Sequence, residues 1–349
     1  MSQRLTQPAI RRIRPEDAQA WRDVRLRALQ DTPEAFGSTY VETLARPPDH
    51  WTDRAAASAT GNESAIFLAD GGDQLLGLVG GYCPTGENEP PELISMWVDP
   101  AARGTRLAER HVNQVVDWAS LAGATRLNLW VTETNARAHR FYERCGFVDT
   151  GTRQPLPSNP SLAEIQMSRP LEDRIAVRRI RSYETEVWRA TRLSALKDAP
   201  DAFGPTYEET LSRSVSAWTE RVQEAATGTQ IAVFAAIRNQ QWVGLAGIGT
   251  AGVNDDLPVG TRHLGSIWIA PEARGQHVLP RLLDAAHDWA AGAGAERIAL
   301  EATETNERAI GIYEQYGYRQ TGISQPLRPG SALNELRMMI DLIAPQEPN

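Results

Sequence analysis

The sequence is short of lysine and of cysteine. Lys197 is the only lysine, and the 36 basic residues are outnumbered by 44 acidic ones, for a formal net charge of −8. Binding along a nucleic acid requires a basic surface, so this charge argues against nucleic acid and against an anionic membrane surface as partners. The two cysteines, Cys83 and Cys145, lack the spacing of a metal site, so we expect no metal and two free thiols.

Long apolar runs are also missing. No stretch approaches the roughly 20 apolar residues of a membrane-spanning helix, and the N-terminal segment lacks the apolar core of a signal peptide. Free thiols are typical of a reducing compartment, so we expect a cytoplasmic protein. A chain of 349 residues is longer than one hydrophobic core usually serves, which predicts two domains.

The chain repeats itself at a domain-sized interval of roughly 170 residues. Residues 13–44 align with residues 180–211, and the alignment resumes further along with the same residues in the same order. The recurring residues include Trp21 and Trp188, Arg25 and Arg192, Phe36-Gly37 and Phe203-Gly204, Trp97 and Trp268, Arg103-Gly104 and Arg274-Gly275, and Gln154 and Gln325. We therefore predict two copies of one domain, residues 1–170 and 171–349, joined by a short segment rich in proline and charge.

Each copy mixes helix and strand patterns. In the first copy, helices are expected over residues 15–30 and 42–57, and strands over residues 64–69, 74–82 and 93–98. A helix with one apolar stripe follows residue 105, then a strand over 125–131 and a helix over 135–145. The fold class expected is α/β (mixed), with a central sheet covered by helices on both faces of each domain.

Three segments carry a recognisable chemistry, and all three occur in both copies. The first joins a strand to the start of a helix, Val98-Asp99-Pro100-Ala101-Ala102-Arg103-Gly104-Thr105-Arg106-Leu107-Ala108. Helix N-terminal N–H groups attract anions, and small residues let a diphosphate approach. The second is Asn135-x-x-Ala138-x-x-Phe141-Tyr142-x-x-x-Gly146-Phe147, and the third is the strand Glu92-Leu93-Ile94-Ser95-Met96-Trp97-Val98.

Taken in this order and duplicated, the three segments resemble those of the GNAT superfamily of N-acetyltransferases. The resemblance implies a central sheet whose middle strands splay apart, acetyl-CoA as the cofactor, and a small-molecule or peptide amine as the acceptor. It also implies which residues bind the cofactor: Met96, Trp97, Val98, Arg103, Gly104, Thr105, Arg106, Leu107, Ala108, Asn135 and Tyr142.

The resemblance further implies two catalytic residues. Tyr142 would protonate the departing thiolate, or else it is an amphipathic core tyrosine. Glu92 would accept the proton of the acceptor amine, directly or through water, or else it is a solvated charge at a strand end. Arg103 would contact phosphate, or else it is a surface charge at a helix start. Asn135 can hold the cofactor arm, cap its helix, or do both.

In the family, the region between the first two helices walls the acceptor pocket, which suggests Phe36, Gly37 and Tyr40 as substrate-side residues. The acidic run over residues 87–92 mildly favours a cationic acceptor.

The second copy departs from the family pattern at its loop, which reads Arg274-x-x-His277-x-Leu279-Pro280. Both small positions are lost there, and the leucine side chain is expected to crowd the diphosphate or the thioester arm. In the first copy only the first glycine is replaced, by Arg106, whose side chain can bind phosphate instead. We therefore expect the N-terminal half to be the catalyst. The less favoured equivalents in the second copy are His263, Ile269, Arg274, Gly275, Asn306 and Tyr313.

The sequence leaves three further questions open. The altered loops also fit a non-catalytic protein that binds an acyl-CoA or another ligand, and they fit an acyl donor other than acetyl-CoA. Because the duplication places two equivalent halves in one chain, both a monomer with pseudo-dimeric halves and a homodimer are compatible with it.

Overall fold

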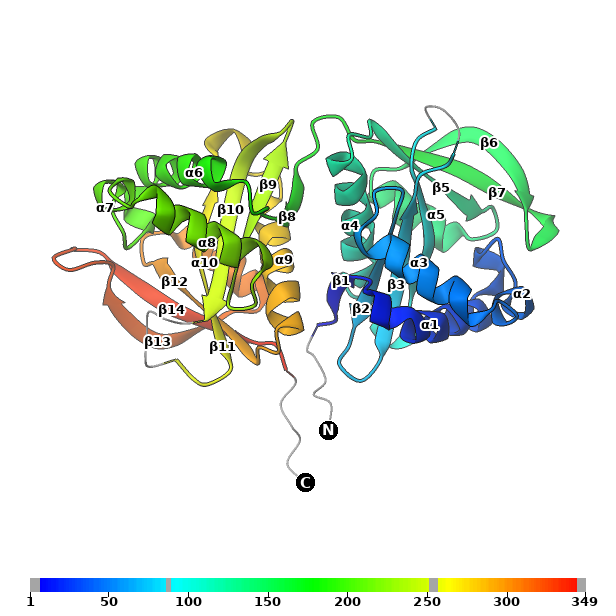
Figure 1. Ribbon diagram of the computed structural model, residues 1–349, viewed down its shortest axis with the longest axis horizontal. Helices are drawn as coiled ribbons and strands as arrows, with labels where there is room; N and C mark the ends of the chain where they lie inside the picture. Colours follow the sequence, from blue (N-terminus) through cyan, green and yellow to red (C-terminus); the bar gives the residue numbers. More distant parts are fainter. Residues whose placement is uncertain (1–6, 86–88, 251–256, 344–349) are drawn as a thin grey trace, which may run out of the picture. The chain divides into compact units, whose positions relative to one another are not determined.

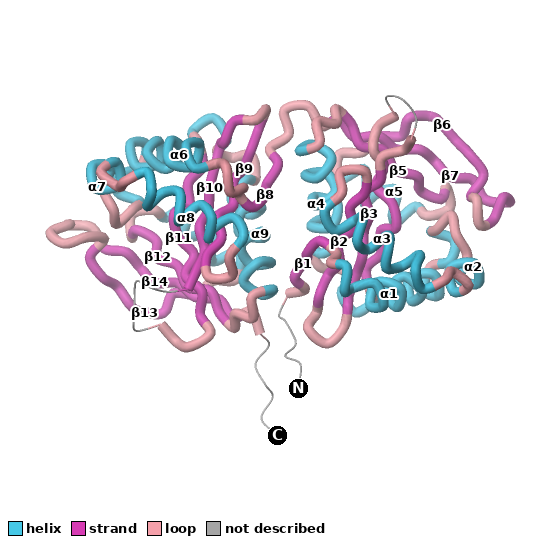
Figure 2. Tube along the Cα trace, viewed as in Figure 1, coloured by secondary structure: helices cyan, strands magenta, loops and turns pink. Residues whose placement is uncertain are grey.

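The computed structural model describes residues 7–85, 89–250 and 257–343. The chain divides into two compact units, which consist mainly of Ile10–Ala176 and Val177–Asn349. The division falls inside strand β8 (Ala176–Arg179), slightly after the boundary that the sequence predicts. Each unit contains one seven-stranded sheet, so the prediction of two tandem mixed α/β domains is confirmed. Figures 1 and 2 show helices packed against the sheet in each unit.

The first unit has the strand order β1-β2-β3-β4-β5-β7-β6. Its strands are β1 (Ala9–Arg12), β2 (Ser64–Asp70), β3 (Leu75–Tyr82), β4 (Glu92–Val98), β5 (Arg126–Thr132), β6 (Val148–Leu156) and β7 (Asn159–Pro170). Its helices are α1 (Ala18–Asp31), α2 (Tyr40–Leu44), α3 (Pro48–Thr60), α4 (Leu107–Leu121) and α5 (Ala136–Arg144), with short 3₁₀ turns at Pro15–Asp17, Pro33–Ala35 and Pro100–Ala102.

The second unit repeats this order as β8-β9-β10-β11-β12-β14-β13. After β8 its strands are β9 (Ile231–Arg238), β10 (Gln241–Thr250), β11 (Thr261–Ile269), β12 (Arg297–Thr303), β13 (Arg319–Pro326) and β14 (Asn334–Asp341). Its helices are α6 (Thr185–Asp198), α7 (Tyr207–Leu211), α8 (Val215–Thr227), α9 (Val278–Gly292) and α10 (Glu307–Tyr316), with 3₁₀ turns at Pro200–Ala202 and Pro271–Ala273.

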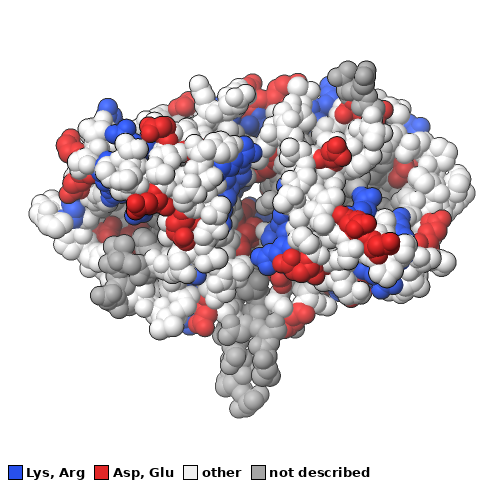
Figure 3. Space-filling model, viewed as in Figure 1, with Lys and Arg blue, Asp and Glu red and all other residues white. Residues whose placement is uncertain are grey.

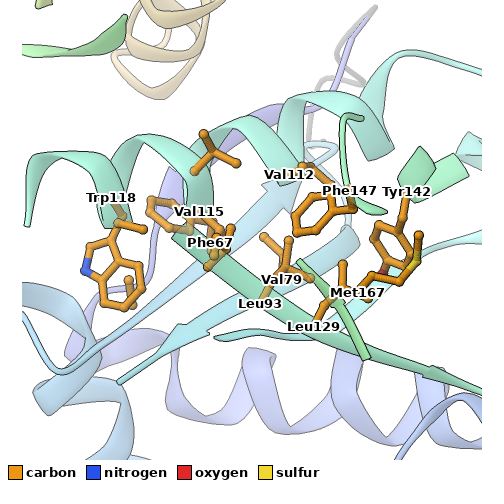
Figure 4. Packing of buried hydrophobic residues seen from close by; sticks show 14 of the residues in the cluster. Phe67, Val79, Leu93, Val112, Val115, Trp118, Leu129, Tyr142, Phe147 and Met167 are labelled. Carbon is orange, nitrogen blue, oxygen red and sulfur yellow. The ribbon is translucent and has the colours of Figure 1, made fainter. Parts of the chain in front are cut away.

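Helices cover both faces of the first sheet and enclose two apolar clusters. One cluster lies under α4 and α5, and Figure 4 shows Trp118 at one end of it and Tyr142 beside Phe147 at the other. The second cluster lies under α1 and α3 and includes the paired rings of Trp21 and Trp51. Burying large side chains on both faces gives the sheet its stability, at about 1.5–3 kcal/mol for each fully buried one.

Gly81 on β3 is required by this packing. A Cβ atom built at Gly81 would lie 2.5 Å from the ring of Trp118, so only a glycine lets α4 lie this close to the strand.

The predicted single helix over residues 42–57 is wrong, because the structure has two helices there. The segment between α2 and α3 ends at Pro47, and Pro48 is the first residue of α3. Pro47 takes the extended backbone of an N-cap residue. A proline cannot donate the backbone hydrogen bond that a continuous helix needs, and it forces the preceding residue away from helical geometry. The pair therefore ends one helix and begins the next.

The two central strands of each sheet separate along their length. In the first unit β4 pairs with β5 in parallel at only two positions, Glu92 with Asn128 and Leu93 with Leu129. Beyond Leu93 the described ladder between the two strands stops. In the second unit, parallel pairing of β11 with β12 likewise stops after His263 and Ala299. The splayed sheet that the family resemblance implies is thus present in both units.

A strained residue lies where the strands separate. Ser95 on β4 has a backbone φ of 58°, and the register of β4 against β3 shifts between Leu78 and Gly80 at the same place. Ser266 in the second unit has a φ of 55° and the same shift. A serine with positive φ is uncommon and mildly strained. Such a bulge turns backbone groups of the strand away from ladder pairing.

Ser95→Gly is expected to raise the free energy of unfolding of the full chain by about 0.5–1 kcal/mol, because glycine tolerates a positive φ. Urea unfolding measures this. The matched control is Ser120→Gly in α4, where a right-handed helix makes glycine unfavourable and the same change lowers stability. A loss of stability in both variants would contradict the strain at Ser95.

Candidate functional site

A cavity of about 390 Å³ lies in the first unit where β4 and β5 separate. Its walls are residues 93–96 of β4, residues 130–132 of β5 and the loop residues 35–38 that follow α1. Helix α5 contributes Ala138 and Tyr142, and the β6–β7 hairpin contributes Gln154 and Glu164. The cavity is therefore built on the separation of the two strands, and elements far apart in the sequence close its sides.

Tyr142 is positioned in this cavity by helix α5. The Asn135 carboxamide oxygen caps that helix by accepting the N–H of Ala138 at 3.1 Å. The Tyr142 ring packs at 5.8 Å from the ring of Phe147 and is 8% exposed. Burial raises the pKa of Tyr142 well above its ordinary value, and the nearby Cys145 adds to the rise. The phenol keeps its proton at neutral pH, as a tyrosine of ordinary pKa would, and so has a proton to donate, although the raised pKa makes it a weaker acid.

Two carboxylates lie in or near the cavity, Glu164 on β7 and Glu92 at the start of β4. Glu164 lines the wall directly and accepts a hydrogen bond from the Gln154 amide at 3.1 Å. Glu92 accepts the indole N–H of Trp130 at 3.2 Å, and it is Trp130 that lines the wall. Burial raises the pKa of both carboxyls, against the opposing effect of these two hydrogen bonds, and the charges of Glu89 and Glu164 raise the pKa of Glu92 further. A carboxylate with a raised pKa is a better proton acceptor.

Asp31 at the end of α1 ties the loop before α4 to the sheet. Its carboxylate accepts the indole N–H of Trp97 at 2.8 Å and pairs with the guanidinium of Arg103. Arg103 also donates to the backbone carbonyl of Val98 at 3.0 Å. The Trp97 side chain is buried in the cluster under α1 and α3, so only its backbone faces the separated strands. In this structure the Arg103 side chain thus helps to hold the loop in position.

The loop itself leaves room at the start of α4. Gly104 has a φ of 84°, and a Cβ atom built on it would meet nothing within 4 Å. The hydroxyl of Thr105 accepts the first helical N–H, that of Leu107, at 3.2 Å. Helical backbone angles at Arg106 continue the turn into α4. The remaining N–H groups of a first helical turn have no acceptor within the helix and suit an anion.

Family comparison agrees with this geometry. The model of the Acetyltransferase (GNAT) family matches residues 25–147 and again residues 193–318. The chain belongs to this family.

Individual relatives match parts of the chain. A mycothiol acetyltransferase of Beutenbergia cavernae is 28% identical over 130 residues, 37% of this chain and 40% of that protein, so the match spans less than half of that relative. A Mycobacterium tuberculosis protein named an uncharacterized N-acetyltransferase is 31% identical over 113 residues, 30% of this chain and 72% of its own. A solved GNAT acetyltransferase from Streptococcus pneumoniae covers 48% of this chain and 99% of its own, with 18% identity and a TM-score of 0.42.

The second GNAT domain begins its loop helix differently. His277, at the position of Arg106, takes the left-handed conformation with a φ of 55°, and α9 follows directly. Leu279 is buried within the domain, with 8% of its surface exposed. Arg274 repeats the contacts of Arg103, since it pairs with Asp198 and donates to the carbonyl of Ile269 at 3.0 Å. The two GNAT domains thus share the loop's anchor and differ in the backbone that follows it.

A charged cluster in the second GNAT domain replaces the Glu92–Trp130 pair of the first. His263 occupies the position of Glu92, and its Nε2 pairs with the carboxylate of Glu301, which stands where the first domain has Trp130. The other oxygen of Glu301 accepts the Nε–H of the buried Arg337 at 3.0 Å. Burial alone would raise the pKa of Glu301, but the hydrogen bonds from His263 and Arg337 outweigh it and lower the pKa.

Two other predicted residues of the second domain keep their local roles. Asn306 caps α10 by accepting the N–H of Ala309 at 3.3 Å. Tyr313 is buried against Tyr318, with ring centres 5.9 Å apart, and burial raises its pKa. Gly275 has a φ of 79°, as Gly104 does in the first domain.

The structure gathers some of the predicted site residues in the cavity and places others outside its wall. Five of them line the cavity: Phe36, Gly37, Met96, Asn135 and Tyr142. Tyr40 instead packs against the cluster under α1 and α3, and Val98 belongs to the cluster under α4. The other predicted site residues of this domain, Glu92, Trp97 and the loop residues 103–108, also lie outside the cavity wall.

Several residues of the wall were not predicted from the sequence, among them Arg25, Ser95, Trp130, Gln154 and Glu164. For three of these residues the sequence contains a signal, which is their recurrence in the second copy. Arg25, Gln154 and Glu164 recur in the second copy as Arg192, Gln325 and Glu335, and the Gln325 amide again donates to Glu335, at 2.8 Å.

Basic and acidic side chains both occur on the face of each domain that Figure 3 shows. Among the described residues, no cluster of three or more His, Cys, Asp or Glu side chains could hold a metal ion. No helix in the described part of the chain is long and apolar enough to span a membrane.

Glu164→Gln is expected to raise the melting temperature more at pH 7.5 than at pH 4. The raised pKa means that the folded state disfavours the ionised carboxylate, a cost that is absent below the ordinary pKa of 4.5 and complete above the folded pKa. Melting curves of the full chain at the two pH values test this. Glu143→Gln, on the exposed side of α5, is the control, and an equal pH response of both variants would contradict the burial effect.

Proposed function

We propose that this protein is an N-acetyltransferase that uses acetyl-CoA and an amine acceptor, a small molecule or a peptide, and that its N-terminal domain is the catalyst. The observation that carries the proposal is the cavity in the first domain, which opens where β4 leaves β5 and holds the protonated Tyr142. An acid buried beside an opened strand, with Glu164 in the cavity wall and Glu92 bonded to the wall residue Trp130, suits a transfer that needs both a proton donor and a proton acceptor.

The residues of the first domain fit acetyl-CoA. The observation that supports this fit is the open space beside Gly104, next to the start of α4. Nothing lies within 4 Å of a Cβ atom built on this glycine. A diphosphate would be held there by the backbone N–H groups of the loop, residues 103–108, and by the Arg106 side chain. The backbone of Met96, next to the bulge, would bind the arm that reaches the cavity. The cofactor supplies the acetyl thioester.

One residue of the first domain would donate a proton during the transfer, and two carboxylates would accept one. Tyr142 holds its proton at Oη and can release it to a leaving group in the cavity. Glu92 lies outside the wall and is bonded to the wall residue Trp130, so it accepts the proton of the acceptor amine through water. Glu164 reaches the wall itself and is therefore the carboxylate that meets the amine.

The second domain is proposed to bind acetyl-CoA less well. The left-handed His277 redirects the backbone just before α9, and Pro280 removes one N–H from the first helical turn. A binding or stabilising role for the second domain is compatible with these differences.

Tyr142→Phe in the full chain is expected to lower kcat for acetyl transfer at least about tenfold, because it removes the acidic proton and keeps the ring. The assay follows free thiol release over a panel of amines. Tyr313→Phe is the matched change in the second domain and is expected to have a smaller effect. A larger effect of Tyr313→Phe would assign catalysis to the second domain instead.

Gly104→Ala is expected to weaken acetyl-CoA binding about tenfold, since a side chain at a positive φ costs about 1–2 kcal/mol and displaces the loop. Isothermal titration of the full chain measures this, with Gly275→Ala as the matched variant. If only Gly275→Ala weakened binding, the second domain would be the cofactor site.

If no amine were acetylated while a ligand raised the melting temperature, the protein would be a non-catalytic binder.

A further inference from the structure

Two side chains of opposite charge line the cavity of the first domain. Arg25 extends from α1, and Glu164 extends from β7. Every other residue of the cavity wall is uncharged in its ordinary state. A ligand that fills this cavity therefore meets a cationic group and an anionic group in addition to apolar surface.

The Arg25 guanidinium has no carboxylate partner among the described residues. It stacks on the Phe36 ring, 4.3 Å from the ring centre, and its Nη2 donates to the Ser38 hydroxyl at 3.1 Å. Its Nη1 is buried and makes no hydrogen bond to any described residue. Burial, together with the charges of Arg46 and Arg54, lowers the pKa of Arg25 to about 10. A buried cation with cationic neighbours is costly unless an anion joins it.

The position of Arg25 is held firmly enough to be a recognition element. The Phe36 carbonyl accepts the Ser158 hydroxyl, and the Glu34 carbonyl accepts the Thr132 hydroxyl of β5. These bonds fasten the loop that carries the Phe36 ring to the rest of the cavity. A guanidinium offers a fork of N–H groups that matches a carboxylate in two hydrogen bonds.

Glu164 offers the complementary charge. It is 7% exposed, and one of its oxygens accepts from Gln154. Its second oxygen takes no hydrogen bond from the residues that the structure describes. An ammonium or amine group in the cavity would supply the missing donors.

We propose that the acceptor is an amino acid or a compound like one, an amine that also carries a carboxylate, with the carboxylate bound by Arg25 and the amine directed at Glu164. This inference rests on the proposed acetyltransferase function and narrows its acceptor class. The carboxylate gives the unpaired guanidinium its anion, and the amine reaches the side of the cavity where the proton acceptors lie.

The second domain provides a matched comparison. Arg192 repeats the arrangement of Arg25, since it stacks on Phe203 at 4.3 Å and its Nη1 is also buried without a hydrogen bond to a described residue. If the arginine served only to support the fold, its removal from either domain would have similar effects. If it binds the acceptor, only the removal from the catalytic domain changes acceptor choice.

The experiment compares amino acids with their own carboxamides as acceptors for the full chain and acetyl-CoA. The wild type is expected to show a kcat/KM at least about tenfold higher for the acid than for the amide. An amide lowers the pKa of its neighbouring amine and so makes it more reactive at neutral pH, which means that a preference for the acid cannot come from the amine. In Arg25→Gln the ratio of the two values is expected to fall toward one, and Arg25→Lys is expected to retain part of it. Arg192→Gln is expected to leave the ratio as in the wild type.

The outcomes separate this inference from the proposed function. Acetylation of amides at least as efficient as that of acids would overturn the inference and leave the acetyltransferase standing. An equal change of the ratio in Arg25→Gln and Arg192→Gln, together with equal losses of melting temperature, would show that the arginine is structural. If no acceptor were turned over, titration of the full chain with N-acetyl amino acids and with their amides would test the inference by binding alone. N-acetyl amino acids that bind no tighter than their amides would overturn it.

Discussion

The separation of β4 from β5 is the constraint on which the rest of the first domain depends. Two parallel strands that pair at only two positions leave backbone groups and side-chain space that a continuous sheet would fill. The strained Ser95 lies in the register shift next to that separation. The apolar clusters on both faces hold the strands in this arrangement, because α4 and α5 pack on one side and α1 and α3 on the other. The cavity, its acid and its carboxylates all follow from the opened strands.

The same scaffold carries different charges in the two domains. Where the first has a carboxylate bonded to an indole, the second has a histidine bonded to a glutamate that is itself held by a buried arginine. Replacing the bulky Trp130 with Glu301 removes apolar surface and requires a cation, which Arg337 supplies. Such a buried network is stable only with all its members present. The two copies therefore share a backbone arrangement and differ in this polar network as a unit.

Some features recur unchanged because the backbone needs them. Asp31 in the first domain and Asp198 in the second each bind a tryptophan and an arginine, and so each joins the first helix of its domain to the loop before α4 or α9. Arg103, which the motif suggested as a phosphate contact, thus helps to hold the loop in position. The positions that recur between the copies include structural anchors as well as cavity residues, and only their contacts distinguish the two.

The sequence by itself determined the duplication, the mixed α/β class and the family, because these depend on residue order and on short-range helix and strand patterns. It also indicated the loop before α4 from the spacing of small residues. It misjudged the helix broken at Pro47 and Pro48, where adjacent prolines override an apolar pattern. Only the tertiary structure decided that the Trp97 side chain faces the core, that Arg103 is bonded to Asp31, and that Arg25 and Glu164 share one cavity. Those facts join residues more than sixty positions apart, and the physical reason is that packing, not local sequence, chooses which distant side chains meet.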